Sequence, residues 1–164
     1  MAKKPVDHTA EAPEPKFERP GHLVRRLHQI CVSVFLDAAK DLNLTSVQYA
    51  TLVGIQDRPG IDQITLGRCI ALDRQTVSNV VNRLHLRGLV ERKNKDKRTK
   101  ALFVTEAGST VIQEMGRRAA AVDETILAPL TQRQRADFMS NLLKLVNSNN
   151  SLSRAPMKMP DQDN

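Results

Sequence analysis

Cysteine is scarce in this 164-residue chain, which contains only Cys31 and Cys69. Two cysteines cannot form the disulfide framework of a small secreted protein, so the composition fits a reducing cytoplasm. The sequence also has no run of about 18 or more apolar residues, and its N-terminal segment lacks the apolar core of a signal peptide. We therefore expect a cytoplasmic protein without a membrane span or a signal peptide.

Motifs of catalysis and of metal binding are missing as well. The sequence has no glycine-rich phosphate loop and no H-x-x-x-H or C-x-x-C spacing. The histidines are scattered, without a cysteine or carboxylate partner at the spacing of metal ligands: His8, His22, His28 and His85. Glu106 and Glu114 fall on one predicted helix, where solvent-exposed charges are a simpler interpretation than an acid–base pair. We therefore expect that the protein is not an enzyme and that it binds no metal and no cofactor.

Positive charge is present, and it is concentrated in one segment. The whole chain has a net charge of +7, and residues 83–100 alone hold eight Lys or Arg and two acids, a net of +6. The eight basic residues are Arg83, Arg87, Arg92, Lys93, Lys95, Lys97, Arg98 and Lys100. Such a concentration is typical of a DNA-docking surface and argues against a protein that serves only as an interaction scaffold.

Residues 73–87 have the pattern of an amphipathic helix. Asp73 is the predicted N-cap, and Gly88 is the predicted residue just beyond the helix end. Apolar residues recur at steps of three and four, at Val77, Val80, Val81 and Leu84. The other side and its flanks carry groups that pair with base edges and phosphates: Gln75, Thr76, Ser78, Asn79, Asn82 and Arg83. We predict that these six side chains face DNA; a merely solvated polar face is the alternative.

A shorter helix is predicted just before this one, from about residue 61 to residue 71, with Asp62 as its N-cap. Its apolar surface is expected to consist of Ile64, Leu66, Cys69 and Ile70. The turn at Ala71-Leu72 then joins two helices in a helix-turn-helix arrangement. Beyond Gly88, the segments LVERK and ALFV read as strands on either side of the basic tip NKDKRTK. The predicted fold is mainly α-helical with a small β-hairpin wing.

Longer helices flank this DNA-binding lobe, which is expected at about residues 45–104. Capping boxes at Thr45–Gln48 and Thr131–Gln134 mark two helix starts, and Pro129 interrupts the helical pattern of 105–148. The apolar stripes of the helices at 21–42 and 105–148 need a partner surface, which indicates dimerisation helices. Residues 1–20 and 149–164 are polar and contain several prolines, so both are predicted to be disordered tails.

Taken together, these features resemble the MarR family of bacterial winged helix-turn-helix transcription regulators. The resemblance spans about residues 22–147 and rests on four stretches: 44–55 (LTSVQYATLVGI), 59–93, the wing at 96–98 (DKR) and 104–108 (VTEAG). It implies that Arg98 enters a minor groove, braced by Asp96, with Lys95 and Lys97 beside it. A turn-forming Asp next to a solvated Arg is the alternative. Many members have Arg where this chain has Asn79, so no base preference is carried over.

The resemblance also implies a homodimer with interleaved terminal helices on a palindromic DNA duplex. It further implies a repressor that a small aromatic acid or its coenzyme A thioester releases. Arg25, Arg26 and His28 would then meet a carboxylate, and Tyr49 would stack or donate its hydroxyl proton; surface charges and a core tyrosine are an equally good interpretation.

A redox-sensing repressor that uses Cys31 or Cys69 is the alternative function. Cys31 follows Leu27 and precedes Val34 and Phe35 on an apolar helix side without a flanking base, so we predict a buried, inert thiol. The peroxide-sensing branch of the family pairs its cysteine with tyrosines, and this chain has only Tyr49.

Overall fold

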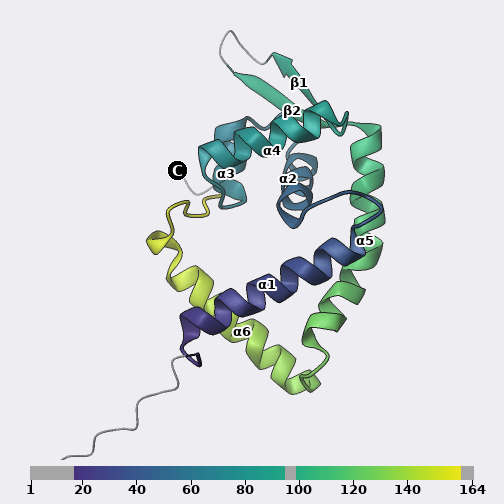
Figure 1. Ribbon diagram of the computed structural model, residues 1–164. Coiled ribbons are helices and arrows are strands. Elements are labelled where there is room, and N and C mark those ends of the chain that lie inside the picture. The colour runs from purple at the N-terminus through teal and green to yellow at the C-terminus, as the bar shows by residue number, and fades with distance from the viewer. Residues whose placement is uncertain (1–16, 95–98, 160–164) are drawn as a thin grey trace, which may run out of the picture.

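The computed structural model describes residues 17–94 and 99–159 of the chain. Within them lie the following elements, drawn in Figure 1: α1 (Pro20–Ala38), α2 (Ser46–Asp57), α3 (Gln63–Cys69), α4 (Arg74–Leu86), β1 (Val90–Asn94), β2 (Lys100–Val104), α5 (Glu106–Leu127), α6 (Gln132–Ser148) and the 3-10 turn η1 (Asn150–Leu152). This order confirms the predicted fold, which is mainly α-helical with a two-stranded antiparallel wing. No helix among the described residues is long and apolar enough to cross a membrane.

Side chains at the helix starts explain where the helices begin. Asp62 accepts hydrogen bonds from the backbone N–H groups of Ile64 and Thr65, and Asp73 accepts one from that of Thr76, as predicted for the two N-caps. Both predicted capping boxes, at Thr45 and at Thr131, are also present. Helix α3 is shorter than expected, because Asp62 caps it and the backbone has turned into the left-handed region by Ala71, at φ +53°.

The wing is anchored to the lobe at its base. Val90 pairs with Val104 and Asn94 with Lys100 across the hairpin. Ile61, just before α3, forms an additional bridge with Leu102, whose N–H donates to the Ile61 carbonyl oxygen over 2.9 Å. The wing is therefore hydrogen-bonded to the start of the helix-turn-helix.

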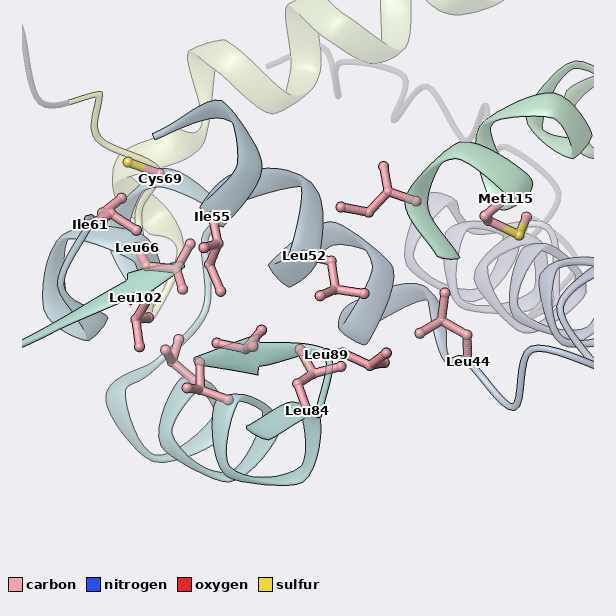
Figure 2. Close-up of a cluster of buried hydrophobic side chains, with 14 of the residues drawn as sticks. Leu44, Leu52, Ile55, Ile61, Leu66, Cys69, Leu84, Leu89, Leu102 and Met115 are labelled. Atoms are coloured by element: carbon pink, nitrogen blue, oxygen red, sulfur yellow. The ribbon is translucent and has the colours of Figure 1, made fainter. Parts of the chain in front are cut away.

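One core joins the helix-turn-helix, the wing and α5. Figure 2 shows Leu52 and Ile55 of α2 facing Leu66, Leu84 and Leu102, which come from α3, α4 and β2. All five side chains are fully buried. Ile112 and Met115 of α5 extend this core, so the long helix is packed on the lobe rather than tethered to it. Burial of this kind positions α4 with its polar side facing outward.

Helices α1 and α6 contain no buried residue. Large apolar side chains are exposed along both, at Leu23, Val24, Ile30 and Leu36 on α1 and at Met139, Leu142, Leu143, Leu145 and Val146 on α6. Figure 1 shows α5 leading away from the wing to a turn, from which α6 leaves in another direction. The chain by itself therefore leaves these two helices largely uncovered.

Other details also differ from the sequence-based expectations. Ile64 is 55% exposed and does not join the apolar surface of α3, whereas Leu66 and Cys69 are buried there as predicted. Cys31 is half-buried rather than buried. Residues 149–159, predicted to be disordered, form η1 and a hydrogen-bonded loop against α3, because contacts with the folded lobe supply the order that their polar composition does not. Residues 17–20 of the other predicted tail form a turn and the start of α1, because the helix begins at Pro20. Residues 1–16 and 160–164 lie outside the described part.

Candidate nucleic-acid interface

Helix α4 separates an apolar side from an exposed polar side. Val77, Val81 and Leu84 are fully buried in the lobe core. Of the six predicted DNA-facing residues, five are exposed: Gln75, Ser78, Asn79, Asn82 and Arg83. The helix therefore presents the amides, hydroxyl and guanidinium that the sequence placed opposite the apolar stripe.

Thr76, the sixth of these residues, helps to start the helix. Its hydroxyl donates to Asp73 over 2.6 Å, and its backbone N–H donates to the same carboxylate over 2.9 Å. These hydrogen bonds hold the pKa of Asp73 below its usual range, so the cap carries its negative charge at neutral pH. The Thr76 hydroxyl proton is therefore already used within the helix cap. Direct contact of Thr76 with DNA stays a prediction.

Gln75 and Asn79 form a linked pair on the exposed side of α4. The Gln75 amide nitrogen donates to the Asn79 amide oxygen over 3.2 Å, one helical turn away. This bond orients the Asn79 amide and does not use the Asn79 nitrogen or the Gln75 oxygen, and both residues are exposed. An amide donor and an amide acceptor on the exposed side of a helix are the groups that can pair with the edge of an adenine.

A groove of about 340 Å³ opens between α3, α4 and the wing. Its lining combines Ser78 and Arg74 of α4 with Gln63 and Ile64 of α3 and with Lys100 of β2. Sequence reasoning did not include Gln63, Arg74 or Lys100 among the site residues. The position of Arg74 directly after the N-cap and of Lys100 at the strand start would have identified two of these residues.

The described part of the wing is basic and packed at its base. Lys93 lies 4.8 Å from the centre of the Phe103 ring and 2.7 Å from the Glu91 carboxylate. β1 ends at the polar Asn94 and β2 begins at the basic Lys100, so such residues flank the tip on both sides. The predicted tip residues Lys95, Asp96, Lys97 and Arg98 lie outside the described residues, so their roles stay predictions.

Two arginines, one from α4 and one from α5, bind the end of α1 and the loop that follows it. Arg87, at the end of α4, donates to the backbone oxygens of Leu42 and Asn43 over 2.9 and 2.7 Å. Arg118 of α5 donates to the Ala38 carbonyl oxygen and pairs with Asp41 and Glu114, and these bonds raise the pKa of Arg118 and lower that of Asp41. Helix α4 is therefore hydrogen-bonded to the loop after α1, and α5 is hydrogen-bonded to the end of α1.

The predicted effector residues lie in two separate places. Tyr49 packs on Phe35, with ring centres 5.9 Å apart. Arg25, Arg26 and His28 are exposed on the first half of α1, which places them roughly 10–15 Å along the helix axis from Phe35. Their joint contact with one ligand stays a prediction. Among the described residues, no group of three or more His, Cys, Asp or Glu is arranged to hold a metal ion.

The lobe, with an exposed polar helix beside a basic wing, is that of a winged helix DNA-binding protein. Residues 42–99 match the model of the MarR family. The chain is 30% identical over 146 residues to the transcriptional repressor NicR of Pseudomonas putida, covering 88% of this chain and 90% of that relative.

Solved structures of other transcriptional regulators are similar to this chain as well. The PcaV regulator of Streptomyces coelicolor is 34% identical, with a TM-score of 0.70, over 81% of this chain and 98% of that one. BpsR of Bordetella bronchiseptica, whose DNA binding is described as regulated by 6-hydroxynicotinic acid, is 26% identical with a TM-score of 0.77, over 83% and 99% of the two chains. The chain belongs to the MarR family. Its members are DNA-binding transcription regulators rather than enzymes.

Proposed function

We propose that this regulator is a homodimeric repressor that binds a palindromic DNA duplex sequence-specifically and that a small aromatic acid or its thioester releases from DNA. The observation that carries sequence-specific binding is the exposed Gln75–Asn79 amide pair on α4, next to Ser78 and the basic base of the wing. Amides read base edges, whereas the neighbouring cations hold the phosphate backbone.

Dimerisation follows from the uncovered helices. Exposed leucine and valine side chains on both α1 and α6 would otherwise stay in contact with water at a substantial free-energy cost. A second copy of the chain supplies an equal surface and places two recognition helices in successive major grooves, about 34–36 Å apart. This spacing requires an operator of two half-sites.

Binding and assembly are tested together. DNA fragments selected by the protein from random duplexes should share an inverted repeat, and light scattering should give the mass of a dimer at micromolar concentration. Leu143→Glu should weaken both dimer formation and operator binding, because it places a charge on the exposed apolar side of α6. A monomer that still binds the selected duplex tightly would contradict the proposal.

The effector proposal rests on relatives and on one cavity. The DNA binding of BpsR is regulated by 6-hydroxynicotinic acid, an aromatic acid, and PcaV has been solved in complex with its natural ligand. In this chain, a cavity of about 570 Å³ lies between the end of α1, the start of α2 and the end of α4. Lys40, Arg83 and Arg87 supply positive charge there, and Leu36 and Leu86 supply apolar walls. A cation beside apolar walls suits an aromatic carboxylate.

Occupation of this cavity would affect DNA binding directly. Arg83 and Arg87 belong to the recognition helix, and Arg87 already holds the loop after α1. A ligand that prefers a changed separation of α1 and α4 would therefore lower DNA affinity, by roughly 5–150-fold for a typical coupling. Linkage requires that operator DNA weaken ligand binding by the same factor.

The effector experiment is a titration of aromatic acids and their coenzyme A thioesters, with and without operator. Lys40→Gln should weaken ligand binding and leave the affinity for operator unchanged, whereas the matched control Arg133→Gln at the exposed start of α6 should change neither. Arg25→Gln tests the other predicted ligand site in the same assay. Release by peroxide instead, lost in Cys31→Ser or Cys69→Ser, would support the redox alternative.

A further inference from the structure

The chain does not end with α6. Residues 150–159, which begin with η1, form what we call the C-terminal loop, and the side chain of Asn150 closes it. The backbone N–H of Met157 donates to the Asn150 amide oxygen over 2.8 Å, and the Asn150 amide nitrogen donates to the Met157 carbonyl oxygen over 2.9 Å. Ala155 N–H donates to the Ser153 hydroxyl oxygen over 3.1 Å. The loop therefore has a defined shape of its own.

The loop is docked on the helix-turn-helix. Lys158 N–H donates to the carbonyl oxygen of Arg68 near the end of α3 over 2.9 Å, and Arg58 lies 3.7 Å from the Met159 sulfur. Figure 1 shows this C-terminal segment rising from α6 to the side of α3. A segment more than 80 residues away in the sequence thus becomes part of the surface around the recognition helix.

The loop borders the groove that opens between α3, α4 and the wing. A cavity of about 280 Å³ between the loop and the lobe is lined by Arg154, Ala155 and Pro156 on one side and by α3 and the start of α4 on the other. Ile64 and Arg74 line both this cavity and the groove that opens toward the wing. The C-terminal loop therefore lies next to the surface that carries Ser78 and Lys100.

Positive charge exceeds negative charge around the cavity between the C-terminal loop and α3. Arg68, Arg74 and Arg154 line the one cavity, and Asp73 is the acid among its lining residues. Both oxygens of Asp73 already accept hydrogen bonds from Thr76. In residues 17–94 and 99–159, none of the three guanidinium groups takes part in a salt bridge. Three cations gathered beside a DNA-binding helix suit a polyanion rather than a protein acid.

We propose that the C-terminal loop is part of the DNA-binding surface, and that Arg154 contacts a phosphate of the duplex backbone beside the start of α4. The proposal rests on the proposed DNA-binding function and extends the surface beyond the recognition helix and the wing. The loop carries Arg154 and Lys158 and no acid, so it adds backbone affinity without base preference. Its docking on α3 holds Arg154 in place before DNA arrives.

The test measures the salt dependence of binding by the full-length protein. Fluorescence anisotropy would give the Kd for a random-sequence duplex long enough for two half-sites, at salt concentrations from about 50 to 200 mM. Loss of one phosphate contact per subunit should reduce the slope of log K against log salt by about 0.9 per contact, or about 1.8 per dimer. The ratio of variant to unmodified Kd should then fall about 12-fold across this range.

Three variants separate charge from structure. Arg154→Gln should show the reduced slope, whereas Arg154→Lys should retain it because the cation remains. Arg133→Gln removes the same charge at the start of α6. Figure 1 shows this place beside the end of α5 that is remote from the wing, so this variant should leave the slope unchanged. Asn150→Ala opens the loop without changing its charge and should reproduce part of the loss.

The outcomes distinguish the loop from the proposed function. Equal slopes for Arg154→Gln and Arg133→Gln, in a protein that binds duplex normally, would overturn the role of the loop and leave the regulator intact. A loss of affinity by the same factor at every salt concentration would also overturn it, because a phosphate contact must alter the slope. If the unmodified protein bound no duplex at all, both proposals would fall.

Discussion

Alanine in place of Gly108 should destabilise this protein, although alanine is the better helix former. Gly108 lies in the first turn of α5, and its N–H donates to the Thr105 hydroxyl oxygen over 3.1 Å. A Cβ at this position would overlap the Leu89 carbonyl oxygen and come within 2.7 Å of the Val104 side chain. The Leu89 oxygen cannot withdraw easily, because it accepts the Thr105 N–H over 3.1 Å.

The magnitude is a difference between two effects. Glycine to alanine inside a helix contributes about 1 kcal/mol of stability through backbone entropy. Forcing a methyl group into a closed contact costs about 1–3 kcal/mol, toward the upper end where the contact is with backbone. We expect Gly108→Ala to lower the free energy of unfolding by roughly 1–2 kcal/mol.

Gly116 provides the matched control on the same helix. A Cβ built there meets only the Tyr49 hydroxyl oxygen, at 3.9 Å, which is an ordinary contact. Gly116→Ala should therefore raise stability by up to about 1 kcal/mol. Urea unfolding at one fixed protein concentration compares the two variants, since the stability of a dimer depends on concentration. Stabilisation by both substitutions would refute the close approach of Gly108 in α5 to Leu89, which follows α4.

Three other predictions concern DNA and pH. Asn79→Ala should cost about 1–3 kcal/mol on the selected operator and little on random duplex, in parallel anisotropy titrations; equal losses would mean backbone contact only. Arg98→Ala should weaken binding to most sequences and reduce its salt dependence, and Asp96→Ala should also weaken binding despite removing a negative charge; tighter binding by the latter would contradict the bracing role.

The pKa values of Asp73 and Asp41 are lowered in the folded state. The two carboxylates therefore stabilise the fold fully above the ordinary carboxyl pKa, about 3.9. This stabilisation is lost as the pH falls through their lower pKa values in the folded state. Asp73→Asn, which preserves a capping oxygen, should flatten that acid-side decline in thermal unfolding; an unchanged pH profile would contradict the lowered pKa.

Much of the fold was predictable because its signals are local. Asp62, Asp73 and the capping boxes act on backbone groups two or three residues away, so their effect can be read from adjacent sequence. The 3–4 spacing of Val77, Val81 and Leu84 likewise fixes which side of one helix is buried. The exposed polar side of α4 then follows by geometry, and with it most of the candidate recognition residues.

The sequence by itself therefore determined where helices begin, which of their sides face the core, and where positive charge collects. Only the tertiary structure decided which distant segments share a surface. The C-terminal loop beside α3, Arg87 on the carbonyls of Leu42 and Asn43, and the closeness of Gly108 to Leu89 each depend on packing between elements far apart in the chain. Composition predicted disorder for residues 149–159 because it counts only what a segment contains, whereas order there comes from the lobe on which the segment lies.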